Sequence, residues 1–155
     1  MTNLERLIAQ QAILDLKARR DHAVDRRDWE TYASLHTEDH VAESVGAKPL
    51  VGGRAVADAL KESAKGVVCA HHSHTPVIEF QDETHATGIW AMEDNLFWHQ
   101  DGEPQWLRGF GFYHERYEKR GGHWLFCYRR LERTHIATSD GVAHLRLDRS
   151  GEARK

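Results

Sequence analysis

The sequence has little of what holds small secreted proteins together. Of its 155 residues only two are cysteine, Cys69 and Cys127. Two cysteines are too few for a disulfide framework, and their separation matches neither a C-x-x-C redox motif nor a zinc ribbon. Free thiols are typical of a reducing compartment, so we expect the protein to work in the cytoplasm.

Long apolar runs and an excess of one charge are also missing. No stretch approaches the roughly 18 consecutive apolar residues of a membrane-spanning helix, and residues 1–20 mix charged with apolar residues, unlike a signal peptide. Lys and Arg (21) nearly balance Asp and Glu (24), for a net charge of -3. Such a chain has no general attraction to polyanions. We therefore expect neither a membrane nor a nucleic acid as a partner.

Histidine is the residue that stands out by its abundance. Apolar residues make up 40% of the sequence and charged residues 29%, as in an ordinary folded domain, but there are twelve histidines. Three of them, His71, His72 and His74, lie close together in the sequence. Histidine titrates near neutral pH and binds metal ions. This cluster is therefore the first candidate for a functional site.

The first half of the chain carries helical patterns. Apolar residues recur at helical spacing from residue 3 to about 26, and Asp28 is a suitable N-cap for a second helix. Polar residues 37–40 are expected to end that second helix. The expected helices span 3–26, 29–35 and 55–64, with a short strand at 41–45 and a strand and turn within 48–54.

The second half is rich in β-branched and aromatic residues. Long strands are expected at 67–80, 84–100, 105–119 and 123–138, separated by short turn-forming segments. Such separators predict consecutive antiparallel hairpins. Helices followed by a long sheet indicate a single α+β domain over residues 1–138, in which the sheet curls over the helices, and disfavour a parallel nucleotide-binding fold. The polar tail, 139–155, is either mobile or folds over the rim of a pocket.

The last strand is apolar on both of its faces. Strict alternation gives one face with Trp124, Phe126 and Tyr128, and another with Leu125, Cys127, Arg129 and Leu131. The three helices can cover only one face of the sheet. We expect a second copy of the chain to cover the other, which predicts a homodimer or a homotrimer.

Two carboxylates continue the apolar row of the first helix. The row Leu7, Leu14 and Ala18 leads at helical spacing to Asp21 and Asp25. A buried carboxylate requires a cation or hydrogen-bond donors, and two acids one turn apart repel each other. The alternative is a helix that stops just before these acids and leaves them solvated or capping the next turn.

The histidine cluster begins where the chain enters the first long strand. Alternation turns His71 and Ser73 to one face and His72 and His74 to the other. A histidine held by a carboxylate is an oriented general base, because the carboxylate fixes the tautomer and stabilises the imidazolium. A pair of Asp25 and His71 would provide such a base.

A metal site is the alternative for the same cluster. His72 and His74 would bind the ion together with a third ligand such as His99. The spacing alone is a weak signal, no cysteine pair or carboxylate stands at ligand spacing, and the helical first half differs from an all-β metal barrel. We therefore expect no metal and no other cofactor. His72 and His74 can also simply hydrogen-bond at a sheet edge.

Arg129 and several aromatic residues are further candidates. If the face that carries Arg129 is concave, its guanidinium lies among apolar residues and requires a buried carboxylate or a departing anion. If the faces are exchanged, Arg129 is outside and the aromatic residues line the pocket. Tyr113, Trp90, Trp98 and Trp106 either belong to the core or line a pocket for a hydrophobic ring compound.

Three segments of the sequence are distinctive: Asp25 before R-R-D-W-E at 26–30, H-H-S-H-T-P-V-I-E-F at 71–80, and Y-H-E-R-Y-E-K-R-G-G-H-W at 113–124. In these segments, and over roughly residues 3–133, the chain resembles the SnoaL-like branch of the nuclear transport factor two-like superfamily. The resemblance implies a cone, in which a curved antiparallel sheet wraps around three N-terminal helices and encloses a deep pocket.

Within this family the layout is most similar to hexachlorocyclohexane dehydrochlorinase, scytalone dehydratase and bile-acid dehydratase. These are lyases in which an Asp-His dyad drives β-elimination. By position, Asp25 and His71 match their dyad, while Arg129 and, more loosely, Arg20 match polar residues of the dehydrochlorinase pocket. Many relatives carry Tyr four residues before the Asp, where this chain has Asp21, which argues against a tyrosine-assisted leaving group.

The resemblance therefore implies a cofactor-independent lyase for a small hydrophobic or polycyclic substrate. His71 would abstract a proton, Asp25 would orient it, and Arg129 would stabilise the departing hydroxide or halide. The residues expected to contact the substrate are Arg20, Asp21, Trp90 and Tyr113. The alternatives are a double-bond isomerase with the same base, and a module that binds a small molecule without chemistry, since fold does not fix function.

Overall fold

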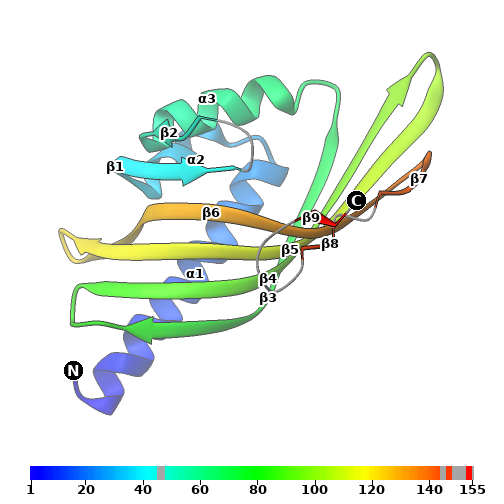
Figure 1. The fold of residues 1–155 in the computed structure, drawn as a ribbon. Coiled ribbons are helices and arrows are strands. Elements are labelled where there is room, and N and C mark those ends of the chain that lie inside the picture. Colours follow the sequence, from blue (N-terminus) through cyan, green and yellow to red (C-terminus); the bar gives the residue numbers. More distant parts are fainter. Residues whose placement is uncertain (45–47, 144–145, 148–152, 155) are drawn as a thin grey trace.

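A computed structural model describes residues 1–44, 48–143, 146–147 and 153–154. Three helices precede the long strands (Figure 1), which confirms the α+β class. The helices are α1 (Asn3–Asp25), α2 (Trp29–Ser34) and α3 (Gly53–Ser63). The strands are β1 (His36–Glu43), β2 (Leu50–Val51), β3 (Val68–Phe80), β4 (His85–Gln100), β5 (Glu103–Arg120), β6 (His123–Thr138), β7 (Gly141–Ala143), β8 (Arg146–Leu147) and β9 (Ala153–Arg154).

The main sheet has the order β2-β1-β6-β5-β4-β3, and β7 pairs with β6 beside this path. Strands β3 to β6 form consecutive antiparallel hairpins, as the turn-forming separators predicted. The sheet is not antiparallel throughout, however, because β1 pairs with β6 in parallel. No hairpin joins β1 to β6, since α3 and three long strands intervene, so their direction is not fixed by a tight turn.

One strand begins earlier than its polar sequence indicated. Residues 37–40 were expected to end the second helix, but β1 already starts at His36 and buries Thr37 and His40. The first residues of β1, which pairs with β6, were therefore not recognised as a strand because their side chains are polar. The strand expected at 41–45 lies partly outside the described residues, because position 45 is not among them.

Helix α1 begins with a capping box, in which Thr2 and Glu5 each accept a hydrogen bond from the other's backbone N–H. It buries a different row from the one that hydropathy predicted: Leu7 is 64% exposed. The buried positions are Ala9, Ile13, Leu16, Lys17, Arg20, Asp21, Ala23 and Val24. The prediction of the row was wrong because three charged residues point inward, where they meet partners on the sheet and on the helix itself.

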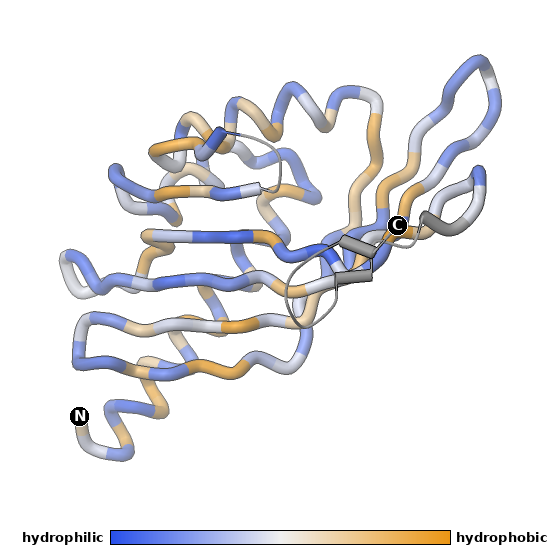
Figure 2. The backbone as a smooth tube through the Cα atoms, in the orientation of Figure 1, coloured by the Kyte–Doolittle hydropathy of each residue, from blue (hydrophilic) through white to orange (hydrophobic). Residues whose placement is uncertain are grey.

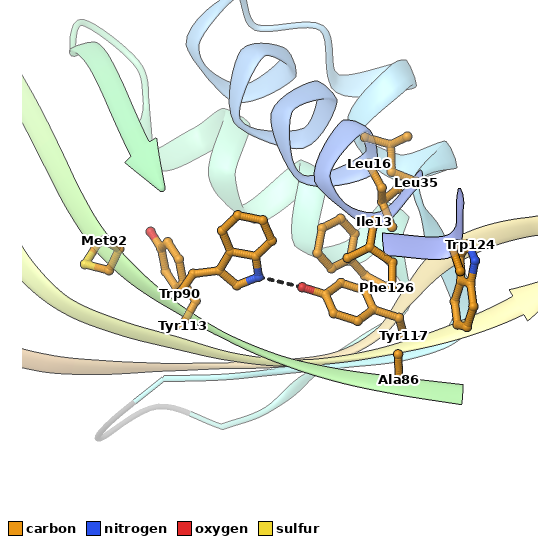
Figure 3. Close-up of a cluster of buried hydrophobic side chains, with 11 residues drawn as sticks. Ile13, Leu16, Leu35, Ala86, Trp90, Met92, Tyr113, Tyr117, Trp124 and Phe126 are labelled. Atoms are coloured by element: carbon orange, nitrogen blue, oxygen red, sulfur yellow. Dashed lines mark hydrogen bonds between the residues drawn. The ribbon is translucent and has the colours of Figure 1, made fainter. Parts of the chain in front are cut away.

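The core lies between α1 and the inner face of the sheet (Figure 3). Ile13 and Leu16 of α1 pack on aromatic residues of the strands. Two of these aromatics are linked, because the indole Nε1–H of Trp90 donates to the hydroxyl of Tyr117 at 2.7 Å. The strand residues of this cluster are Ala86, Trp90, Met92, Tyr113, Tyr117, Trp124 and Phe126.

A β-bulge in β6 overturns the strict alternation expected for this strand. Phe126 pairs with Tyr117 and Tyr128 pairs with Arg116, so Cys127 is an extra residue. The bulge changes the phase of the side chains: Trp124 and Phe126 face inward before it, and Arg129 and Leu131 face inward after it. Tyr128 faces outward, where the guanidinium of Arg116 lies 4.0 Å from its ring centroid.

A second bulge in β6 is matched by a glycine. The register shifts between Phe110 and Gly111 of β5, opposite residues 133–135 of β6. A Cβ atom at Gly111 would collide with the backbone carbonyl of Glu132. A residue without a side chain therefore allows the two strands to approach here.

The outer face of the sheet has no described helix over it, since α1 crosses the opposite face (Figure 1). Three apolar side chains on this outer face, Val77, Ile89 and Phe112, are 60%, 44% and 38% exposed. The homodimer or homotrimer stays a prediction. Within the described residues, no helix is long and apolar enough to cross a membrane.

The long β4–β5 hairpin extends beyond α3, and its tip is hydrophilic (Figures 1 and 2). Past residue 138 the chain continues the sheet, because β7 pairs with the end of β6. The proposed role of the tail at a pocket rim falls largely on residues 144–145, 148–152 and 155, which lie outside the described residues.

Two buried histidines in β1 should make the protein sensitive to acid. Burial lowers the pKa of His40 to about 4 and that of His36 to about 2. Between pH 6.5 and 4 the unfolded chain therefore binds protons at these rings that the folded chain does not, and the free energy of unfolding falls as the pH falls. For His40 alone the loss at pH 4 should be about 3 kcal/mol.

Urea unfolding between neutral pH and pH 4 measures this loss. In His40→Leu the free energy of unfolding should depend less steeply on pH than in the wild type, whereas in His123→Leu, at an exposed position, the pH dependence should be unchanged. If the free energy of unfolding of His40→Leu falls as steeply with pH as that of the wild type, His40 is not a source of the acid sensitivity.

Candidate active site

A cavity of about 470 Å³ opens between α1, α3 and the inner face of the sheet. Its volume suits a small or medium-sized ring compound. The apolar lining consists of Val24, Leu60, Ala64, Val67, Leu96, Trp98, Leu107, Tyr113 and Leu131. The charged or titratable lining consists of Arg20, Cys69, His71, Asp94, Arg129 and Arg133. The walls are thus mostly apolar, with polar groups at a few positions.

Asp25, the last residue of α1, contacts His71 of β3. Its Oδ1 accepts a hydrogen bond from Nδ1–H of His71 at 2.7 Å. The backbone N–H of His71 also donates to both carboxylate oxygens, at 3.2 and 3.0 Å. With the proton held on Nδ1, the lone pair is on Nε2, and His71 lines the cavity.

The turn after α1 holds these two residues together. Arg27 takes a left-handed conformation with φ of 60°, and Asp28 caps α2 by accepting from the backbone N–H of Thr31 at 3.0 Å. The guanidinium of Arg27 donates to the carbonyl of Ala64 at 2.9 Å, just before β3 begins. The end of α1 is thereby fixed beside the start of β3.

Asp94 of β4 is a site residue that the sequence analysis missed. Its side chain is buried in the cavity wall. Oδ1 accepts from the hydroxyl of Tyr113 at 2.9 Å, and Oδ2 accepts from Nη2 of Arg133 at 2.6 Å. Oδ1 also lies 3.8 Å from Nε2 of His71. The imidazole thus has a carboxylate on each side.

A signal for Asp94 was present in the sequence. In strand alternation it follows Trp90 and Met92, two inward-facing apolar residues, and so belongs to the same face. Burial and Asp94 together raise the pKa of Tyr113 above its usual value, although Arg129 opposes this. Tyr113 therefore stays protonated and acts as a hydrogen-bond donor.

Beneath the cavity, Lys17 of α1 is paired with Glu115 of β5. The Nζ of Lys17 lies 2.5 Å from Oε1 of Glu115, and the hydroxyl of Tyr117 donates to Oε2 at 2.6 Å. Both charged side chains are inaccessible to solvent, at 1% and 0% exposure. Burial lowers the pKa of Lys17 to about 8 although Glu115 opposes the shift. The ion pair ties the middle of α1 to the sheet.

Asp21 supports the site from behind and does not line the cavity. It accepts from Nη1 of Arg20 at 2.8 Å and from the hydroxyl of Ser73 at 2.6 Å. Burial opposes its ionisation, but Lys17 and Arg20 outweigh burial and lower the pKa of its carboxyl to about 2. Asp21 is therefore an anion that orients Arg20 toward the cavity.

Arg129 faces inward, which decides between the two arrangements left open for it. Its guanidinium carbon lies 3.8 Å from the ring centroid of Tyr113, a cation–π contact. Its Nε is 3.6 Å from Glu115 and makes no hydrogen bond within the described part of the chain. Arg129 thus brings a positive charge to the cavity wall.

The other expected residues are placed as follows. Arg20 and Tyr113 line the cavity, whereas Trp90 lies in the core with its indole bonded to Tyr117 and does not reach the cavity. Of the two places that the sequence left open for Trp90, the structure thus has it in the core. Trp98, further along β4, lines the cavity.

Comparison with known proteins agrees with the architecture. A family model described as a SnoaL-like domain matches residues 5–130. A putative scytalone dehydratase from Novosphingobium aromaticivorans DSM 12444 superposes with a TM-score of 0.78 at 24% identity, covering 94% of each chain. A hexachlorocyclohexane dehydrochlorinase, LinA-type3 from Novosphingobium barchaimii LL02, gives 0.79 at 21% identity, covering 92% of this chain and 97% of that one.

A further similar structure has no stated function. It is Rv3472 from Mycobacterium tuberculosis, with a TM-score of 0.73 at 28% identity over 86% of this chain and 76% of that chain.

The pair of Lys17 and Glu115 should be essential for stability. Lys17→Met removes the nearest cation of buried Glu115 and leaves Arg129, whose Nε is 3.6 Å away, as its counter-charge. The free energy of unfolding should therefore fall by about 3 kcal/mol, the lower end of the range for a broken buried pair. The double variant Lys17→Met with Glu115→Gln removes both charges and should recover part of that loss. Urea unfolding measures all three proteins, with exposed Lys61→Met as the control. A loss in Lys17→Met no larger than in Lys61→Met would show that the pair contributes little.

Proposed function

The chain belongs to the SnoaL-like family, and on this basis we propose that it is a cofactor-independent lyase for hydrophobic ring compounds. The reaction is a β-elimination that removes water or hydrogen halide. The observation that carries the proposal is the hydrogen bond between Asp25 and His71 at the wall of a mostly apolar cavity.

In this reaction His71 is the base. Its Nε2 takes a proton from a ring carbon, and the electron pair of that C–H bond becomes the new double bond. Asp25 keeps the other ring proton on Nδ1 and stabilises the imidazolium that forms. Oδ1 of Asp94 lies 3.8 Å from Nε2, beside the nitrogen that takes the proton.

Arg129 receives the leaving group. As the bond to the leaving group breaks, its electron pair departs with hydroxide or halide, and an N–H donor with positive charge stabilises that anion. Arg20, held by Asp21, adds to the positive potential. A departing hydroxide can take the proton from His71 and leave as water. An isomerase would have no leaving group for Arg129 to stabilise.

Asp94 also defines the substrate. A carboxylate oxygen can accept more than one hydrogen bond, and Oδ1 receives one, from Tyr113. A substrate with a hydroxyl group near the reacting carbon can donate the next. The substrate is then a ring compound with a hydrogen-bond donor at the Asp94 side of the cavity and an electronegative leaving group at the Arg129 side.

His71→Gln and Asp25→Asn should each reduce turnover by about 10³- to 10⁴-fold while the fold and ligand binding are retained. The double variant should be little worse than either single variant, because residues that act as one unit are not additive. Activity is measured as loss of water or hydrogen chloride from hydroxylated and chlorinated cyclic compounds, followed by mass spectrometry.

His99→Gln is the control, because this exposed histidine of β4 does not line the cavity and should leave turnover unchanged. Turnover by the unsubstituted protein should fall as the pH is lowered toward about 5, because a protonated imidazole accepts no proton. Multiplicative losses in the double variant, or a flat pH profile, would argue against the pair. Ligand binding without turnover of any tested compound would favour the binding module.

The role of Asp94 is tested with a ligand pair, 1-naphthol and 1-methoxynaphthalene, which differ in the hydrogen-bond donor. The wild type should bind 1-naphthol about tenfold more tightly, because a hydrogen bond to a charged group contributes about 1.5–3 kcal/mol. Asp94→Asn should reduce that preference to about twofold. Calorimetric titration measures both affinities. Glu79→Gln, at an exposed carboxylate of β3 that does not line the cavity, should behave as the wild type, and equal affinities in the wild type would refute the role.

A further inference from the structure

Three side chains gather on the outer face of the sheet, directly behind the cavity. His72 and His74 alternate away from the cavity on β3, and Glu93 stands opposite His72 on β4. One ligand atom from each of the three residues lies within 4.8 Å of the other two. The Nε2 of His74 is 4.0 Å from Oε2 of Glu93. The cluster shares no residue with the elimination site.

The donor set has a definite chemical preference. Two imidazole nitrogens and one carboxylate oxygen suit zinc and related first-row divalent ions, whereas calcium and magnesium prefer oxygen alone. Ligands on one zinc ion, at bonds of about 2.1 Å, stand about 3.4 Å apart. The side chain of His74 is 51% exposed and can rotate by the small amount required. Water can fill the remaining position.

The carboxylate of this cluster is already oriented. The side-chain amide of Asn95 donates to Oε1 of Glu93 at 3.0 Å, while the other oxygen, Oε2, is the one nearest His74. A neighbour that hydrogen-bonds a ligating group in this way fixes its direction and is typical of metal sites. Paired strands carry all four residues, so binding requires side-chain adjustments alone.

We propose that His72, His74 and Glu93 bind a divalent transition-metal ion, with zinc as the first choice. This proposal departs from the expectation, drawn from the sequence, that no metal binds. The alternative considered there had His99 as the third ligand, but the register brings Glu93 to that position, and His99 pairs with Pro104 near the end of β4. The site is structural with respect to the proposed elimination, in which the metal takes no part.

The proposed metal site lies on the same two strands as His71 and Asp94, so metal binding would also affect the cavity. His71 pairs with Asp94 in the register, and the next pair is His72 with Glu93. A metal ion bridging β3 and β4 on the outer face therefore fastens together the same two strands that carry the base and its second carboxylate. An ion that binds only the folded chain also raises its stability by mass action.

The test is calorimetric titration of the full chain, without an affinity tag and stripped by a chelator, with zinc chloride at neutral pH. One equivalent should bind. His74→Ala and Glu93→Gln should each weaken binding by about tenfold or more. The side chains of His74 and Glu93 are 51% and 31% exposed and lie outside the core, so both variants should fold. His99→Ala and His123→Ala are the matched controls, since they remove other exposed histidines and should keep wild-type affinity.

A second measurement uses the thermal unfolding midpoint. Zinc chloride should raise the Tm of the wild type and of both controls, but not that of His74→Ala, and acid should abolish the effect because protonated histidines do not bind metal. Equal zinc affinity in His74→Ala and the wild type, equal losses in the controls, or no binding by the wild type would each overturn the proposal.

Discussion

The docking of α1 across the sheet depends on charges that water cannot reach. Lys17 of α1 meets Glu115 of β5, and Asp21, paired with Arg20 on the helix itself, accepts from Ser73 of β3, in positions that an ordinary amphipathic helix fills with apolar residues. The pair of Lys17 and Glu115 has strict geometry, because a shifted helix would separate two buried charges. The register of α1 against the strands is therefore set more narrowly than apolar packing alone would set it. The placement of Asp25 beside His71, at the end of the same helix, follows from that register.

Much of the fold could be predicted because its elements are long and strongly patterned. The helices and the four hairpin strands were placed to within a few residues, and Asp28 acts as the expected cap. The errors have a common physical cause, which is that polar groups can be buried when they find partners. Lys17 and Arg20 turned the inner row of α1 away from the one that hydropathy indicated, and β1 was concealed by its histidines.

The candidate site was likewise predicted in part, and the residue that was missed is again a buried polar group with partners. The resemblance to SnoaL-like lyases was enough to expect Asp25, His71, Arg20 and Arg129 near one another, and all but Asp25 line the cavity. Asp94 was not expected, because a lone carboxylate in a strand is usually solvent-exposed and its partners, Tyr113 and Arg133, come from other strands. Trp90 was expected to contact the substrate but belongs to the core, which was the other place that the sequence left open for it.

The bulge at Cys127 affects which changes of sequence β6 can accept. On either side of it β6 follows opposite phases, so its first half supplies aromatic rings to the core and its second half supplies Arg129 and Leu131 to the cavity. The extra residue uncouples these two segments, and each can vary in sequence without altering the direction of the other. Deletion of Cys127 would leave every residue of the cavity wall in the chain. It would nevertheless turn the side chain of Arg129 from the cavity toward the solvent. A functional wall of this protein therefore depends on a count of residues as much as on their identity.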